Sequence, residues 1–293
     1  MSGYLEGVLI LVGINIIAVL GVSILTGFTR LFSFGNAGFM ALGAYVAALC
    51  SVKLGFPFIF SIVAAVLFTG LVSYFLGKLT LGLKGDYFLI ATLGFGESVR
   101  VILEYASSIT GGARGLPGIP THTTLPVVIA SVVFAIVIAS NFLRSKYGRN
   151  LMAIREQEIA AEAVGIDTAR YKIMSFVMSA VFAGWAGALY AHYLSFISPV
   201  MFNLDKSAEL TITVVIGGLG SITGSVLATI LLTALPELFR DASVYRMLLY
   251  GLAVVLIITL RPAGLFGYRE FSFSGLRSWV TGLFKSKSAA EGS

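Results

Sequence analysis

The amino-acid sequence predicts an all-α fold, a polytopic bundle of transmembrane helices with about seven to nine membrane segments. Two observations lead to this prediction. Apolar residues make up 57% of the 293 residues and charged residues only 12%, which leaves too little polar surface to cover a water-soluble globule. The apolar residues also gather in runs of about 20, the length of helix that crosses a bilayer.

The composition excludes several other classes of protein. The mean hydropathy of +0.94 excludes a disordered chain and a cytosolic enzyme. A single cysteine, Cys50, excludes a disulfide scaffold and cysteine-based metal sites. The net charge of +6 comes from bases at the ends of apolar runs and in the C-terminal tail. Membrane orientation explains those positions, so we expect no nucleic-acid binding.

The apolar runs predict the helices of the bundle in chain order. No repeat or low-complexity tract separates them, so we expect one membrane domain over residues 1–267. A cytoplasmic tail over residues 268–293 should follow, partly interfacial and partly disordered. The runs are Leu5–Gly27, Phe32–Cys50, Pro57–Gly77, Tyr87–Leu103, Leu125–Leu143, Ile173–Phe196, Leu210–Leu235 and Val244–Leu260.

Lysines and arginines predict the orientation, because short cytoplasmic loops are enriched in them. Segment 144–172 holds six of these bases, and the tail after Leu260 holds five more. Both segments should therefore be cytoplasmic. Counting spans backward from residue 144 places Arg30, Lys78 and Lys84 on the same side, and the N-terminus, Lys53 and Arg114 outside.

In this orientation the run Ile173–Phe196 leaves the cytoplasm and the run Val244–Leu260 returns to it. The glycine-containing run between them, Leu210–Leu235, must therefore enter and leave the membrane on the same side. Glycine is costly inside a helix and permits backbone angles closed to other residues. We therefore predict a re-entrant hairpin of two half-helices with both ends outside. Irregular backbone at membrane depth is tolerated only inside protein or beside a wet cavity, so the glycines are candidate pathway residues. An ordinary helix with a close helix–helix contact is the alternative. The glycines are Gly217, Gly218 and Gly220, with Gly224 beyond them.

Three charged residues share one face of the fourth run. Glu97, Arg100 and Glu104 are spaced i, i+3 and i+7, and charges in membrane helices are expensive unless they pair or line a cavity. The Glu97–Arg100 spacing permits a local ion pair. A structural pair that faces the bundle and a polar lining of the pathway are both open interpretations.

Within segment 144–172, the sequence predicts one short amphipathic helix from an Asn150 cap to a left-handed Gly165. Such a helix at the membrane surface either offers a face to a cytoplasmic partner or rests on lipid. The spacing leaves both interpretations open. The apolar side consists of Ala153, Ile154, Ile159, Ala160, Ala163 and Val164, and the acidic side of Glu156, Glu158 and Glu162.

The sequence offers no group for catalysis or for binding a metal or a nucleotide. His122 and His192 have no carboxylate or cysteine at ligand spacing, and they form no catalytic triad. The pair Gly77-Lys78 lacks the upstream glycine of a phosphate-binding loop. We therefore expect no enzyme, no catalytic residue, no metal and no cofactor, with any ATP hydrolysis on another polypeptide.

Several stretches, in order and spacing, resemble branched-chain amino-acid ABC transporter permeases, specifically the LivM-like subunit. Each stretch is moderately specific, and their order along nearly the whole chain is strongly so. They include LFSFGNAGFMALGAYVAAL at 31–49, LKGDYFLIATLGFGESVRVILE at 83–104, TGGARGLPGIP at 110–120, GRNLMAIREQEIAAEAVGIDTARYK at 148–172, FAGWAGALYAHYLSFISP at 182–199 and VVIGGLGSITGSVLA at 214–228.

The resemblance implies the permease subunit of an ATP-driven importer of branched-chain or related hydrophobic amino acids in the bacterial cytoplasmic (inner) membrane. The implied partners are a LivH-like second permease, two ATP-binding subunits, an extracytoplasmic solute-binding protein and membrane lipids. The solute-binding protein would dock on the outside loop Thr110–Pro120. The coupling helix that contacts the ATPase would include Glu156, Glu158, Ala161, Glu162 and Gly165.

Two other functions remain alternatives at this point. An ion-coupled secondary transporter working alone also has broken helices and charges at membrane depth, but it gives the cytoplasmic helix no task. An ABC permease for urea or another small organic solute would share the same motifs. An intramembrane enzyme is remote, because the chain lacks catalytic groups.

Overall fold

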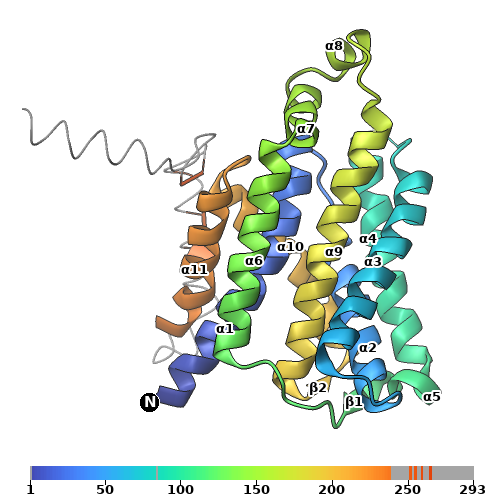
Figure 1. Cartoon of the computed structure of the whole chain (residues 1–293), viewed down its shortest axis with the longest axis vertical. Coiled ribbons are helices and arrows are strands. Elements are labelled where there is room, and N and C mark those ends of the chain that lie inside the picture. The colour runs from blue at the N-terminus through green and yellow to red at the C-terminus, as the bar shows by residue number, and fades with distance from the viewer. Residues whose placement is uncertain are drawn as a thin grey trace, which may run out of the picture.

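The computed structural model is a bundle of helices that run alongside one another (Figure 1). The structure describes residues 2–83 and 85–238, together with residues 251, 252, 254, 255, 259, 264 and 265. The helices are α1 (Ser2–Val22), continued by the π-helix Ser23–Gly27, α2 (Asn36–Val52), α3 (Phe58–Thr80), α4 (Asp86–Tyr105), α5 (Ser107–Thr110), α6 (Leu125–Arg144), α7 (Lys146–Glu156), α8 (Glu158–Ala163), α9 (Thr168–Leu194), α10 (Leu204–Gly217) and α11 (Ile222–Leu238).

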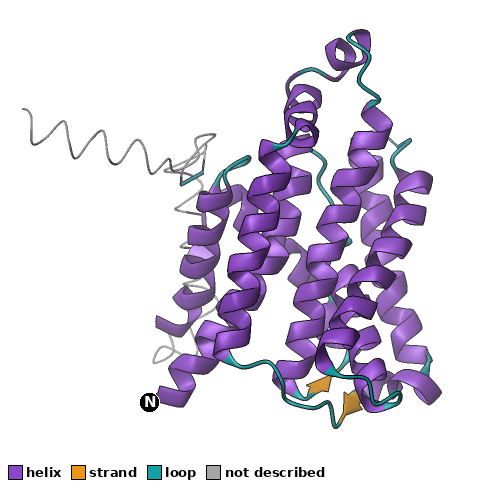
Figure 2. Ribbon diagram, viewed as in Figure 1, coloured by secondary structure: helices purple, strands orange, loops and turns teal. Residues whose placement is uncertain are grey.

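The two ends of the bundle differ in structure. At one end, called here the α7 end, α7 and α8 form a projecting loop between α6 and α9 (Figure 1). At the other, called the strand end, β1 (Leu116–Pro117) pairs antiparallel with β2 (Phe196–Ile197), as Figure 2 shows. Short 3-10 helices, Gly112–Arg114 and Pro199–Phe202, lie beside these strands in the chain.

The expected all-α membrane fold is confirmed in the described part of the chain. Four helices there are long and apolar enough to cross a membrane, and two more are apolar but shorter. The count of seven to nine membrane segments stays a prediction. The run Val244–Leu260 lies mostly outside the described residues, and the tail 268–293 lies entirely outside them. The four long helices are Gly3–Gly27, Phe58–Thr80, Leu125–Arg144 and Thr168–Leu194, and the shorter ones are Asn36–Val52 and Ile222–Leu235.

α9 forms the centre of the bundle together with α1 and α2. Small residues along α9 let its neighbours approach closely, as small residues do between membrane helices. A Cβ built on Gly43 of α2 would overlap the backbone of Gly184, and one built on Gly187 would overlap the carbonyl oxygen of Met40. α3 and α6 lie on the outside, where few of their residues are buried.

α2 and α10 begin beside the middle of other helices. A Cβ on Gly38 would lie 2.8 Å from Cα of Gly96, about halfway along α4. The amide of Ala37 donates to Oγ of Ser207 near the start of α10, at 2.9 Å. The predicted run began at Phe32, but the chain before Asn36 is not helical. This non-helical segment is tolerated because side chains such as Thr92, which accepts from the amide of Phe34 at 3.2 Å, satisfy its backbone.

The predicted glycine break in the seventh run is present between α10 and α11. Gly218 and Gly220 have φ of +111° and +96°, and a Cβ on Gly217 would lie 2.7 Å from the carbonyl oxygen of Gly224. The run is therefore two helices packed side by side, and not one helix. Its turn lies at the α7 end, because a Cβ on Gly220 would lie 2.6 Å from Nη1 of Arg155. That the hairpin is re-entrant stays a prediction.

Candidate functional site

The α7–α8 loop is the first candidate site, and it starts at a tight turn. Ser145 ends α6 and caps α7, because its Oγ accepts from the amide of Tyr147 at 3.2 Å. The turn leaves no room for a side chain at position 148. A Cβ on Gly148 would overlap the carbonyl oxygen of Leu143. Leu151 and Ile154 then bury α7 against the end of the bundle.

The predicted single helix from Asn150 to Gly165 is wrong in two respects. The helix begins earlier, at Lys146, because Ser145 supplies the cap and Asn150 lies inside α7. It is also broken at Gln157, whose backbone is extended with φ −158° and ψ 104°. The predicted end at Gly165 is confirmed. Its φ is +86°, and the amides of Gly165 and Ile166 donate to the carbonyls of Glu162 and Ala161, as in a Schellman motif.

Two acids of the loop, Glu158 and Glu162, tie α8 to α9 while they stay exposed. Glu158 forms an ion pair with Lys172 of α9, and Glu162 accepts from the hydroxyl of Thr168 at 2.7 Å. Ala161 is buried, whereas the side chains of Ile159 and Val164 are 78% and 77% exposed. The sequence placed acids and apolar residues on opposite sides of one helix, and on α8 residues of both kinds are exposed. Exposed apolar side chains on a braced loop are available for contact with a partner protein or with lipid.

Arg155 connects this loop to the rest of the bundle. Its Nη1 donates to the carbonyl oxygen of Gly27, at the end of the π-helix, at 3.3 Å. Its Nη2 pairs with Oε1 of Glu156 at 2.8 Å. The same guanidinium lies against Gly220 in the α10–α11 turn. One side chain thus joins α7 to the end of α1 and to the glycine turn.

A charged cluster on α4 is the second candidate site. Arg100 lies between two acids, with Nε 2.8 Å from Oε2 of Glu97 and Nη1 3.5 Å from Oε2 of Glu104. The predicted Glu97–Arg100 ion pair is therefore present. All three side chains stay about one-third exposed on the single chain. Since lipid tails solvate charge poorly, this face of α4 needs a polar neighbour or water.

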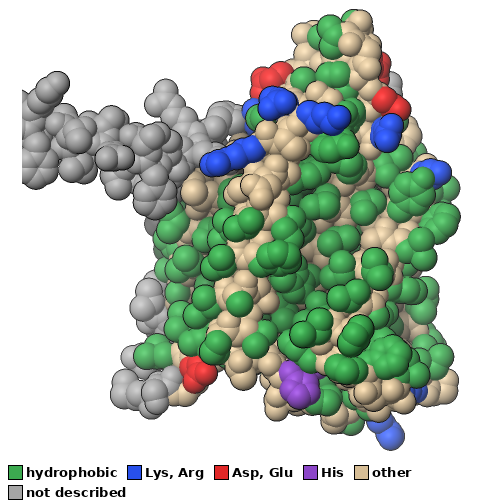
Figure 3. Space-filling model, viewed as in Figure 1, with side chains coloured by type: hydrophobic (Ala, Val, Ile, Leu, Met, Phe, Trp, Pro, Cys, Tyr) green, Lys and Arg blue, Asp and Glu red, His purple; other side chains and the backbone are tan. Residues whose placement is uncertain are grey.

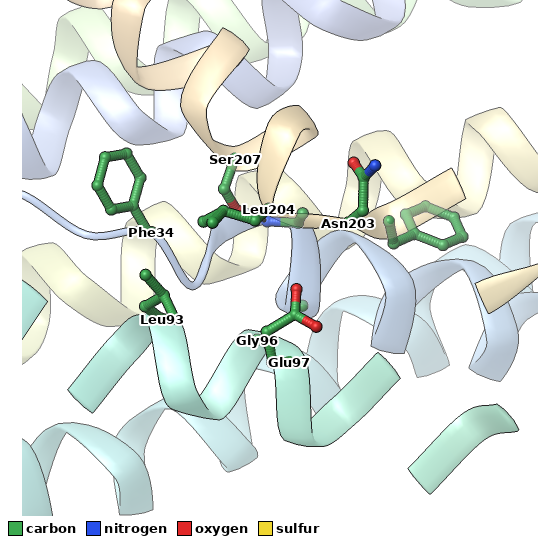
Figure 4. A pocket seen from close by; sticks show the side chains of 10 residues that line it. Phe34, Leu93, Gly96, Glu97, Asn203, Leu204 and Ser207 are labelled. Carbon is green, nitrogen blue, oxygen red and sulfur yellow. Dashed lines mark hydrogen bonds between the residues drawn. The ribbon is translucent and has the colours of Figure 1, made fainter. Parts of the chain in front are cut away.

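Glu97 also lines a narrow crevice where α2, α4 and α10 meet. Figure 4 shows its carboxylate pointing from α4 toward Asn203 and Leu204 at the start of α10. The crevice combines a carboxylate with the N-terminal ends of two helices that begin inside the bundle. The remaining lining residues are Phe34, Ala37, Gly38, Leu93, Gly96, Phe202 and Ser207.

Sequence reasoning missed a second polar group beside α1. Lys206 of α10 donates through Nζ to Oε2 of Glu209 at 3.0 Å and to Oδ1 of Asn15 at 3.1 Å. Asn15 in turn donates to the hydroxyl of Thr233 in α11 at 3.5 Å. The sequence signal for this group is the pair Lys206 and Glu209 at i, i+3, just before the apolar run Leu210–Leu235.

The structure does not bring the predicted pathway residues together. Glu97 and Arg100 lie on α4, with Glu97 in the crevice. Gly217, Gly218 and Gly220 lie at the turn at the α7 end, where they approach Gly224, Gly264 and Arg155. They form two separate places on the described part of the chain.

These features define a multi-pass α-helical integral membrane protein with a projecting loop at one end. Residues 4–260 match the family model described as "Branched-chain amino acid transport system / permease component". The chain belongs to this family, and so is the permease subunit of an ABC importer.

Individual relatives agree with this assignment. The chain is 36% identical to the high-affinity branched-chain amino acid transport system permease protein LivM of Escherichia coli (strain K12), over 86% of this chain and 67% of that protein. It is 27% identical to LivH of the same organism, over 62% of this chain and 64% of LivH. It is also 27% identical to the ribose import permease protein RbsC of Haemophilus influenzae, over 58% of this chain and 51% of RbsC. No solved structure matches the chain significantly.

Proposed function

We propose that the chain lines one half of the path of an importer for branched-chain or related hydrophobic amino acids in the bacterial inner membrane. A LivH-like permease would line the other half. Two ATP-binding subunits and an extracytoplasmic solute-binding protein would complete the complex. The family and the names of the LivM and LivH relatives support this substrate and this second permease.

The distribution of charge supports a cytoplasmic α7 end. Lys and Arg side chains gather at that end in Figure 3, above a broad hydrophobic belt. Lys53 contacts the α5 segment at the other end, where its Nζ donates to the carbonyl of Ser108. Because bases mark the cytoplasmic side, the strand end would face outward. The loop Thr110–Pro120, which contains β1, would then be available to the solute-binding protein.

The coupling role of the α7–α8 loop rests on one observation: α8 is braced by its acids and presents its apolar residues. Ile159 and Val164 project from a loop that Glu158 and Glu162 tie to α9. In the proposal these side chains enter the ATP-binding subunit. Closure of that subunit would move α8, and Arg155 would pass the movement to the end of α1 and the glycine turn. The partner must bind the two states differently to shift them.

The translocation path would run along the exposed charged face of α4. Glu97, Arg100 and Glu104 are partly exposed on the single chain, which suits a face that meets water and the second permease. The α10–α11 hairpin, with Gly217, Gly218 and Gly220 at its turn, would be the re-entrant element that closes the path at the α7 end.

Co-purification tests the coupling contact. An affinity-tagged parent chain should retain its ATP-binding subunits, and Ile159→Ser with Val164→Ser should lose them, because both side chains are exposed and the change removes only contact area. Glu158→Lys should act in the same direction by unbracing α8. Leu54→Ser, at a residue 63% exposed in the α2–α3 turn, is the matched control. Full retention of partners by both loop variants would overturn the proposal.

The substrate is tested separately. The RbsC relative carries a different solute in its name, so a permease of this kind can serve an importer of another substrate. Uptake of leucine into vesicles with the complete complex should exceed uptake of urea or ribose. The reverse order would assign another small solute. Uptake driven by an ion gradient without ATP would instead favour a secondary transporter.

A further inference from the structure

A basic cavity lies at the α7 end, beside the turn from α6 into α7. Its volume is about 290 Å³. Three arginines line it and no carboxylate does, among the residues that the structure describes. Three apolar side chains and one serine are also among the lining residues. The lining residues are Phe28, Ser140, Leu143, Arg144, Arg149, Met152, Arg155 and Gly220.

The positive charge of this cavity exceeds the nearby negative charge. Arg155 pairs with Glu156. Nη1 of Arg149 donates to the carbonyl oxygen of Arg144 at 3.3 Å, a neutral acceptor. The side chains of Arg144 and Arg149 are both exposed. Two cationic side chains therefore line a concave surface to which no described lining residue contributes an anion.

The cavity continues an apolar stripe of α6 that faces outward. Ile129, Val133 and Val137 are 55%, 56% and 48% exposed, and their spacing places them on the same helix face as Ser140 and Arg144. On the opposite wall, α11 begins just after Gly220 and exposes Leu227 and Ile230 farther along. A molecule with an anionic head and apolar chains would fit this order of polar and apolar surface.

We propose that this cavity binds the phosphate group of an anionic phospholipid in the leaflet at the α7 end. Guanidinium groups match phosphate oxygens in two-pronged hydrogen bonds, and the Ser140 hydroxyl supplies a further donor. Basic pockets among helix ends on the cytoplasmic side are suited to acidic headgroups. The acyl chains would lie along the apolar stripe. This inference does not depend on the ATPase contact at α8.

Native mass spectrometry of the purified full-length chain tests the site, with phosphatidylglycerol and phosphatidylethanolamine as probes. The parent should retain phosphatidylglycerol in preference to phosphatidylethanolamine. Arg144→Gln with Arg149→Gln should lose roughly 30-fold in phosphatidylglycerol affinity, since two basic contacts at an anionic surface are removed. The matched control is Lys146→Gln with Arg170→Gln, which removes the same charge from the same end without touching the cavity. Arg144→Lys with Arg149→Lys keeps the charge but not the two-pronged donors, so it should restore only part of the binding.

Competition with inorganic phosphate distinguishes the two sources of the phosphate group. Phosphatidylglycerol should stay bound at millimolar phosphate, because its chains add apolar contact. Displacement of the lipid by phosphate would show that the cavity binds a free anion, and it would contradict the proposed lipid site. Equal loss in the cavity and control variants would show that general surface charge attracts the lipid, and unchanged binding in both would show that the lipid binds elsewhere. Either result would also overturn the site.

Discussion

Gly148 determines how closely α7 can follow α6. A Cβ at this position would overlap the carbonyl oxygen of Leu143, and backbone atoms in a helix end cannot move aside as a flexible side chain can. Ser145 fixes the turn from the other side by capping α7. The direction in which the loop leaves the bundle therefore depends on the absence of a side chain at one residue.

Gly148→Ala should lower the stability of the protein by about 1–3 kcal/mol, the usual cost of forcing extra atoms into a packed site. The matched control is Gly94→Ala, also helical but with nothing within 4 Å of its Cβ. It should leave stability unchanged or raise it by up to about 1 kcal/mol, because alanine favours a helix. The measurement is the midpoint of thermal unfolding of the purified complex. Equal midpoints for the two variants would contradict the account of the turn.

Some residue-level contacts could be predicted and others could not. The Glu97–Arg100 pair could, because both residues lie on one helix at a spacing that fixes their distance. The contacts of the two histidines could not be predicted. His192 is buried, with Nε2 2.7 Å from Oγ of Ser51, and its ring centroid lies 6.4 Å from that of His122. Residues 70 positions apart in sequence meet only through the fold, and no local pattern encodes that meeting.

The break between α7 and α8 is the feature of the elements that sequence reasoning missed most clearly. Residues 150–163 are good helix formers, so their local preference favours one continuous helix. Tertiary contacts override it at Gln157. Glu158 and Glu162 are held by Lys172 and Thr168 of α9, and α8 can reach them only if the chain changes direction first.

Gly165→Ala should loosen the end of α8. An L side chain at φ +86° costs about 1–2 kcal/mol, while the open space around Gly165 excludes a steric clash. Hydrogen exchange at the amides of Gly165 and Ile166 should therefore speed up roughly tenfold in the alanine variant. Gly165→Asn is the control, since asparagine tolerates this conformation better. Unchanged exchange in the alanine variant would show that the φ angle imposes no strain.

Arg155→Gln should separate ATP hydrolysis from transport. The variant loses the charged contacts to Gly27 and Glu156 but leaves the exposed apolar tip of α8 intact. The assembled complex should keep ATP hydrolysis near the parental rate, while amino-acid uptake falls about tenfold, a typical size for a coupling effect. Arg170→Gln, on the first turn of α9, is the control. A parallel fall in both activities would point to lost assembly instead.

For the whole molecule, the orientation is a prediction from charge that can be measured directly. Cys50 is buried, and Cys50→Ala gives a background for single cysteines. In vesicles that hold the chain without ATP-binding subunits, Ile159→Cys should react with an impermeant thiol reagent from the cytoplasmic side only. Leu54→Cys and Val200→Cys, at exposed residues of the strand end, should react from the outside only. Labelling of position 159 from outside would overturn the importer account.

The overall class of the molecule could be predicted because it depends on composition and run length, which the bilayer sets. The positions inside the bundle where α2 and α10 begin could not be predicted. Phe32–Cys50 reads as one apolar run, yet the chain before Asn36 is not helical. Thr92 accepts the amide of Phe34 there, and Ser207 accepts the amide of Ala37 in the first turn of α2. Those partners lie far along the chain. Apolar run length locates a helix, and distant side chains decide where it begins.

The crossing of α2 and α9 has a mechanical consequence. At Gly43 and Gly184, and again at Gly187 and Met40, the two backbones touch with no side chain between them. Surfaces that interlock so tightly cannot slide, because every displacement drives atoms into each other. The two helices must then move as one rigid unit. Any change between inward- and outward-open states has to occur around that unit. α3 packs on the same unit, since a Cβ on Gly184 would overlap Oγ1 of Thr69. The parts left to move are α6 and the α10–α11 hairpin.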